Sequence, residues 1–136
     1  MKADSFLIII IAAAILTVSC AAVAHTVKDD DNGFISLSVD EFEKAIADKE
    51  VVRVDVRSQE EWEAGHIPGS VVIDVQKDDF LDKAKAILPK DKTIAVNCRT
   101  GRRSKTAAAI LAEEGYNVID LDTGFEGWKE AGKPVE

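Results

Sequence analysis

Two periodicities alternate along the chain from residue 34 onward. Valine-rich runs such as 51–56 alternate apolar and polar residues, and a period of two predicts β-strands. Elsewhere apolar residues recur every three or four positions, as Val39, Phe42 and Ile46 do, which predicts amphipathic helices. The expected strands are residues 34–37, 51–56, 71–73, 93–96 and 118–121.

Polar residues indicate where two of the helices begin. Ser38 precedes Glu41 by three positions, and Ser58 precedes Glu61 by the same interval, which is the spacing of a capping box. Pro89 and Gly115 are typical of the residues that follow a helix end. The expected helices follow the two boxes and cover residues 80–88, 104–114 and 125–129.

About five short strands interleaved with helices predict an α/β domain. Its sheet should be mainly parallel, because helical crossovers join parallel strands and cover both faces of the sheet. The chain of 136 residues has the size of one domain, which we place at residues 33–136.

Residues 1–24 follow a different pattern. Lys2 precedes an unbroken apolar run, residues 6–16, and the small residues 22–24 then resemble a cleavage site, as in a secretory signal peptide. The alternatives are lipidation at Cys20 and retention of residues 6–24 as a membrane anchor. All three would export the domain, most simply to the periplasm, with membrane contact only through residues 1–24. Residues 25–32 read as an acidic linker.

The chain is acidic overall, but it contains one short basic motif. The formal net charge is −8, and removing residues 1–24 with Lys2 and Asp4 leaves it unchanged. Such an acidic surface argues against nucleic acid as a partner. Against this background, residues 99–103 hold three arginines directly after Cys98, the only cysteine beyond residue 24. A lone cysteine in an exported domain is either a buried inert thiol or a reactive one.

The position of Cys98 favours the reactive alternative. It follows the strand expected at 93–96, and ligands of α/β sheets bind beyond the carboxyl ends of strands. The backbone N–H groups of residues 99–103 can form an anion nest, Gly101 allows a tight loop, and the next helix is expected to begin at Ser104. The positive end of that helix favours a thiolate and a bound anion.

Three basic side chains also favour a thiolate and a bound anion, and the length of the loop distinguishes between the reactions that such a loop could catalyse. Arg99, Arg102 and Arg103 all lie within five residues of the thiol. A Cys-x5-Arg phosphatase loop would require arginine at position 104, which is Ser104. The smaller loop disfavours phosphate-ester or arsenate chemistry and suits a sulfur atom carried on Cys98.

Three motifs resemble the rhodanese homology domain, in particular its single-domain exported thiosulfate sulfurtransferases. They are VDVRSQEEWEAGHIPGSVVID at 54–74, CRTGRRS at 98–104 and GFEGWKEAGKPV at 124–135, in the family's order. The resemblance implies a rhodanese-like fold in which Cys98 takes the outer sulfur of thiosulfate, expels sulfite and passes the sulfur to cyanide or a thiol. It also implies no cofactor and no metal, and we expect a monomer.

The same resemblance implies roles for the neighbouring residues. Residues of the loop would bind the donor: Arg99, Thr100, Gly101, Arg102 and Arg103. Asp55, Arg57 and Ser104 would support the site, with Asp55 orienting a loop arginine, and His66 would be structural rather than a general base. An alternative remains open in which the domain does not turn over thiosulfate but carries a persulfide to a protein partner.

Overall fold

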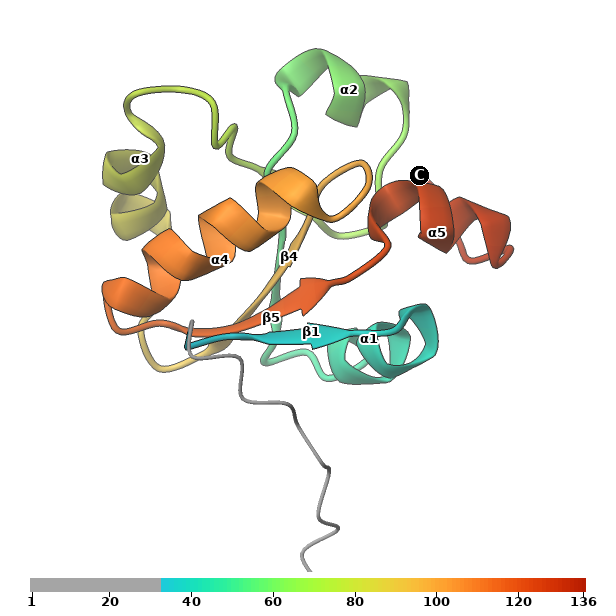
Figure 1. Ribbon diagram of the computed structural model, residues 1–136, viewed down its shortest axis with the longest axis horizontal. Helices are drawn as coiled ribbons and strands as arrows, with labels where there is room; N and C mark the ends of the chain where they lie inside the picture. Colours follow the sequence, from blue (N-terminus) through green and yellow to red (C-terminus); the bar gives the residue numbers. More distant parts are fainter. Residues whose placement is uncertain (1–32) are drawn as a thin grey trace, which may run out of the picture.

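Strand and helix alternate without exception from β1 to α5 (Figure 1). The protein is described by a computed structural model, which covers residues 33–136; the expected leader and acidic linker lie outside the described residues. The five strands pair only in parallel, in the order β1-β5-β4-β2-β3. They are β1 (Ile35–Leu37), β2 (Val52–Asp55), β3 (Val71–Val72), β4 (Thr93–Asn97) and β5 (Asn117–Leu121).

Four of the helices cover the two faces of the sheet. One apolar cluster joins α3 and α4 to the sheet, and a second joins α1 and α5 to the opposite face. The remaining helix, α2, has no buried residue and follows the carboxyl end of β2. The helices are α1 (Val39–Ile46), α2 (Gln59–Ala64), α3 (Phe80–Ile87), α4 (Arg102–Glu113) and α5 (Gly124–Glu130).

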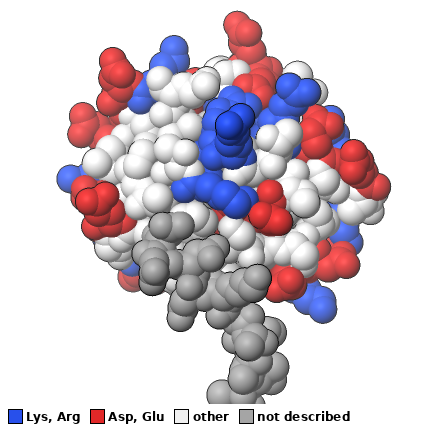
Figure 2. All heavy atoms as spheres, viewed as in Figure 1, with Lys and Arg blue, Asp and Glu red and all other residues white. Residues whose placement is uncertain are grey.

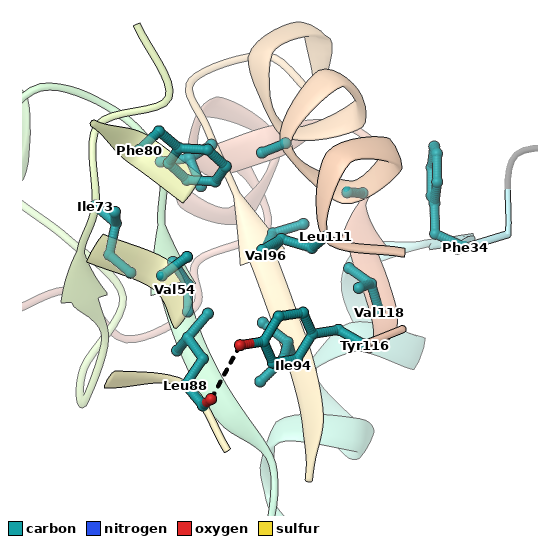
Figure 3. Close-up of a cluster of buried hydrophobic side chains, with 14 of the residues drawn as sticks. Phe34, Val54, Ile73, Phe80, Leu88, Ile94, Val96, Leu111, Tyr116 and Val118 are labelled. Atoms are coloured by element: carbon teal, nitrogen blue, oxygen red, sulfur yellow. Dashed lines mark hydrogen bonds between the residues drawn. The ribbon is translucent and has the colours of Figure 1, made fainter. Parts of the chain in front are cut away.

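The larger cluster illustrates how the period of two builds the core. Val54, Val96 and Val118 come from three neighbouring strands and pack on the same face, under Leu111 of α4 (Figure 3). The Tyr116 hydroxyl donates a hydrogen bond of 3.1 Å to the Leu88 carbonyl, which satisfies the one polar atom of this buried ring. The alternate residues of β4 and β5, Ala95, Ile119 and Leu121, belong to the second cluster on the other face.

The expected elements are all present, and the sheet is parallel throughout. One boundary matters for the site: α4 begins at Arg102 and not at Ser104 as expected. Gly101 precedes it at φ 95°, a left-handed conformation that lets the chain turn directly from the loop into the helix. Ser104 is consequently buried in the first turn of α4. Within residues 33–136, the helices are too short or too polar to cross a bilayer.

Candidate active site

Cys98 lies one residue beyond β4, at the carboxyl edge of the sheet. Its residue is 1% exposed, so the thiol lies beneath the loop that follows it. The Gly101 N–H donates a hydrogen bond of 3.1 Å to Cys98 Sγ, and Ser104 Oγ lies 3.5 Å from the same sulfur. The loop therefore bends back over the sulfur and forms a cradle in which Gly101 supplies the backbone donor.

The first turn of α5 holds the beginning of this loop. The Phe125 N–H donates to the Cys98 carbonyl at 2.8 Å, and the Glu126 N–H donates to the Arg99 carbonyl at 3.0 Å. This approach requires glycine at position 124, where a Cβ atom would lie 2.5 Å from the Arg99 carbonyl oxygen. The local sequence does not indicate this role for Gly124, because its neighbours in the chain give no sign that it faces residue 99.

Arg103 is held by a carboxylate of α2. Its Nη1 and Nη2 atoms lie 2.7 and 2.8 Å from the two oxygens of Glu61, a bidentate pair. The hydrogen bond from Arg103 lowers the pKa of Glu61 to about 2, and the same bond raises the pKa of Arg103. Because Glu61 also accepts from the Ser58 N–H in the capping box of α2, this pair fastens α2 to the start of α4.

The other two loop arginines are exposed and differ in their partners. Arg99 Nε lies 3.8 Å from Glu126 Oε1, at the limit of an ion pair. Arg102 forms no hydrogen bond or ion pair with any side chain of residues 33–136. Figure 2 shows basic side chains gathered near the amino-terminal end of α4 on an otherwise mixed surface. Arg102 is thus the loop arginine whose charge is not paired with a carboxylate of residues 33–136.

Asp55 does not orient a loop arginine as expected. Its buried carboxylate accepts from Arg57, with Nη2 2.7 Å from Oδ2 and Nε 3.0 Å from Oδ1. Arg57 also donates to the Gly65 carbonyl at 2.7 Å and stacks 4.4 Å above the Phe125 ring. The reason lies in the pleat: Asp55 is in register with Asn97 and shares its face, whereas α4 packs on the opposite face.

A cleft of about 360 Å³ lies beside the Cys98 loop, between α2 and α5. It carries both signs of charge around an aromatic ring. The residues that line it are Arg57, Glu61, Ala64, Gly65, Arg99, Phe125, Glu126 and Lys129. Arg99 connects this cleft to the loop, so a molecule bound there would lie next to the residue that follows the thiol.

The remaining expectations concern His66 and metal ligands. His66 stacks on Trp62 at 3.9 Å between ring centroids, and its Nδ1 lies 2.8 Å from the Trp62 carbonyl oxygen. His66 also exchanges backbone hydrogen bonds of 3.1 and 2.9 Å with Glu136. Its polar contacts within residues 33–136 are therefore with α2 and Glu136 and not with Cys98. Within the described part of the chain, no cluster of three His, Cys, Asp or Glu side chains is arranged to hold a metal ion.

Comparison with known proteins identifies the family to which this fold belongs. Residues 38–131 match the family described as "Rhodanese-like domain", and the chain belongs to that family. A rhodanese-related protein of Thermoplasma volcanium has a similar structure, with a TM-score of 0.66, 33% identity and coverage of 74% of this chain and 96% of that one.

Two bacterial proteins are similar to this chain in sequence. The putative sulfurtransferase YtwF of Bacillus subtilis (strain 168) is 36% identical over 92 residues, which are 68% of this chain and 86% of that protein. The thiosulfate sulfurtransferase GlpE of Pseudomonas savastanoi pv. phaseolicola is 38% identical over 88 residues, covering 63% and 79% of the two chains. The similarity to both extends over most of the described domain.

Proposed function

We propose that this protein is a sulfurtransferase that uses Cys98 as its sulfur carrier. The observation that carries the proposal is the Gly101 N–H, 3.1 Å from Cys98 Sγ, in a loop followed by the free amino-terminal end of α4. A backbone donor on the sulfur stabilises negative charge there, on a thiolate and on a persulfide alike. Membership of the rhodanese-like family and the similarity to proteins named sulfurtransferases support this activity.

The proposed donor is thiosulfate. The Cys98 thiolate attacks the outer sulfur, the sulfur–sulfur bond of thiosulfate breaks, and sulfite leaves with the bonding electron pair. We assign the sulfonate end of the donor to Arg102, because no carboxylate of residues 33–136 neutralises its charge. Arg103 contributes less to the donor, since Glu61 already occupies both of its terminal nitrogens.

The second half of the reaction requires an acceptor from outside the domain. Cys98 is the only cysteine of residues 33–136, so no second thiol of the domain can attack the persulfide. A thiolate or cyanide attacks the outer sulfur of the persulfide, forms a new bond to it and releases the Cys98 thiolate. The intermediate should therefore persist when no acceptor is supplied.

Mass spectrometry tests this assignment directly. Trypsin releases Cys98 in the peptide 93–99, which separates it from Cys20. After incubation of the full chain with thiosulfate, this peptide should carry one additional sulfur atom, and a small thiol should remove it. The variant Cys98→Ser should show neither the mass change nor turnover, because no described group activates a hydroxyl at this position. Activity retained by Cys98→Ser would refute the mechanism.

A persulfide carrier is the second candidate. The cleft beside Arg99 supports it, because both signs of charge in a groove of about 360 Å³ fit a polar segment of an acceptor protein. Steady-state turnover with thiosulfate and a small thiol separates the candidates. A carrier would take up sulfur once, or only from a polysulfide, and would not turn over with these small substrates.

We also propose that the domain works outside the cytoplasm, as a monomer and without nucleic acid. The apolar run at 6–16 and the small residues 22–24 support export by residues 1–24. Fractionation of cells, with determination of the amino-terminal residue, tests this proposal. Cleavage after Ala24 supports a signal peptide, and a lipidated chain beginning at Cys20 supports the lipoprotein alternative. A full-length cytoplasmic protein would refute export.

A further inference from the structure

Lys105 lies under the Cys98 loop and contacts two segments at once. It stands in the first turn of α4, and its Nζ lies 3.0 Å from Asp120 Oδ2 and 3.0 Å from Asp122 Oδ1. The same ammonium donates to the Gly101 carbonyl at 3.2 Å. Gly101 is the residue whose N–H donates to Cys98 Sγ, so Lys105 holds the other polar group of the cradle's central residue.

Lys105 forms an ion pair with Asp120, whose side chain is fully buried. The Asp120 carboxylate is 0% exposed and accepts a second hydrogen bond from Ser36 Oγ at 2.8 Å. Its other oxygen, Oδ1, has no hydrogen-bond partner within residues 33–136. Lys105 is the basic side chain that compensates this buried negative charge, which lies on β5, next to the strand that Cys98 follows.

The ionisation of Lys105 is consistent with this role. Burial lowers its pKa, but hydrogen bonds to Asp122 and Asp120 outweigh burial, and the net pKa is raised. Lys105 therefore stays positively charged at neutral pH, where sulfur transfer is expected to operate.

The backbone around Gly101 explains why a cation is needed there. A Cβ atom on Gly101 would lie 2.0 Å from the Asp122 carbonyl oxygen, so the loop is pressed against the end of β5. Lys105 Nζ lies 3.4 Å from that Asp122 carbonyl and 3.2 Å from the Gly101 carbonyl. The shared ammonium thus joins the backbone oxygen of Gly101 to that of Asp122 at the end of β5.

We propose that Lys105 is a positioning residue for sulfur transfer: it clamps the Gly101 carbonyl to the end of β5 and so keeps the Gly101 N–H on Cys98. The proposal rests on Cys98 being the sulfur carrier, and it adds a residue that touches neither the sulfur nor the donor. The local sequence does not indicate this role, because the aspartates that Lys105 contacts lie 15 and 17 residues further along the chain.

The test separates the clamp from simple charge compensation. In the full chain, the alkylation rate of Cys98 by neutral iodoacetamide is read on the tryptic peptide 93–99 and compared with thiosulfate turnover. The variant Lys105→Met should lower both rates about ten-fold, because the cradle donor is no longer held on the sulfur. Lys133→Met is the matched control, since Lys133 also bridges two carboxylates but on α1, and both rates should be unchanged.

A double variant keeps the result interpretable if Lys105→Met is unstable. Lys105→Met with Asp120→Asn removes both charges, so the thermal midpoint should return toward that of the wild type while alkylation stays about ten-fold slow. Asp120→Asn alone should alkylate at least as fast as the wild type. If the double variant alkylates at the wild-type rate, Lys105 is only a counter-ion and the proposal is wrong.

A different result would refute the proposed function and leave this inference standing. In that case the wild type takes no sulfur from thiosulfate or a polysulfide, while Lys105→Met still slows alkylation of Cys98 and the double variant does not restore it. Sulfur uptake by the wild type thus tests the proposed function, and alkylation of Cys98 in the variants tests the role of Lys105.

Discussion

The helices α2 and α4 both begin at the carboxyl edge of the sheet, but their first turns are satisfied in opposite ways. At α2, the Ser58 hydroxyl accepts a hydrogen bond from the Glu61 N–H, and the Glu61 carboxylate accepts one from the Ser58 N–H. The helix is therefore capped by residues of its own first turn. At α4, Gly101 precedes the helix and no side chain caps its N–H groups. A first turn that the local sequence satisfies is structural, whereas an uncapped one beside a thiol is available to an anion.

Packing follows the same division. No residue of α2 is buried, and this helix is attached to the loop through the Glu61–Arg103 pair. In contrast, α4 buries Ser104, Ala107, Ala108 and Leu111 against the sheet. The uncapped amino-terminal end therefore belongs to a helix that is packed into the core, whereas the capped helix lies at the surface and contacts it through an ion pair. Single substitutions near α2 and α4 test these differences between the two helices.

The largest effect is expected at Gly101. Gly101→Ala places a Cβ atom 2.0 Å from the Asp122 carbonyl oxygen in a residue at φ +95°. We expect a loss of about 3 kcal/mol of unfolding free energy and a loss of sulfur transfer, because the loop must move away from Cys98. Urea unfolding and thiosulfate turnover measure the two effects.

Gly132→Ala is the matched control for this substitution. Gly132 also has positive φ, +71°, but no atom lies within 4 Å of a Cβ built on it. It should cost about 1 kcal/mol through backbone strain alone and leave turnover intact. Equal effects of the two substitutions would show that the close contact at Gly101 is unimportant.

The next effect is expected at Arg102, at the uncapped end of α4. Arg102→Ala should lower kcat/KM for thiosulfate about ten- to a hundred-fold, because a hydrogen bond between charged groups is lost. The thermal midpoint should change little, since this side chain is exposed and has no carboxylate partner among residues 33–136. Arg99→Ala, which removes an arginine already facing Glu126, should have a smaller kinetic effect. The opposite ranking would contradict the assignment of Arg102 to the donor.

The Glu61–Arg103 pair predicts a pH dependence of stability. The pKa of Glu61 is lowered from 4.5 to about 2 in the folded protein, so its contribution is present above pH 4.5 and is lost as the pH falls toward 2. The Glu61 side chain is 33% exposed, and after allowance for solvent screening we expect about 1–2 kcal/mol.

Chemical denaturation at a series of pH values measures this contribution. Glu61→Gln should lower stability at neutral pH and reduce the slope between pH 4.5 and 2, where the pKa shift of Glu61 acts. An unchanged slope in Glu61→Gln would assign the acid sensitivity to other carboxylates.

The smallest effect is expected at the capped helix. Ser58→Ala removes the side chain that accepts from the Glu61 N–H at 3.2 Å and should cost about 1 kcal/mol of unfolding free energy. Sulfur uptake by Cys98 should be unchanged, because Ser58 satisfies only α2. Ser38→Ala, at the equivalent cap of α1, is the control and should behave alike. A selective loss of sulfur transfer in Ser58→Ala would mean that the α2 cap is part of the active site.

Local patterns in the sequence determined the elements and the class of chemistry. The periods of two and of three to four predicted the strands and helices, since each side chain's burial repeats with the backbone geometry of its own element. The two serine boxes predicted where α1 and α2 begin. The motif CRTGRRS, with Cys98 after a strand, was sufficient to predict a loop that bends back over a thiol and carries positive charge.

Only the tertiary structure decided which of the charges in and directly after that motif are paired with carboxylates. Arg103 pairs with Glu61 and Lys105 with Asp120, and these partners are 42 and 15 residues apart in the chain. The start of α4 at Arg102 depends on the close approach of Gly101 to Asp122. Asp55 forms its ion pair with Arg57 because it lies on the face of the sheet opposite to α4. Such pairings depend on strand order and on which side of the pleat a residue occupies. Both are set by the packing of the whole domain, and local periodicity does not encode them.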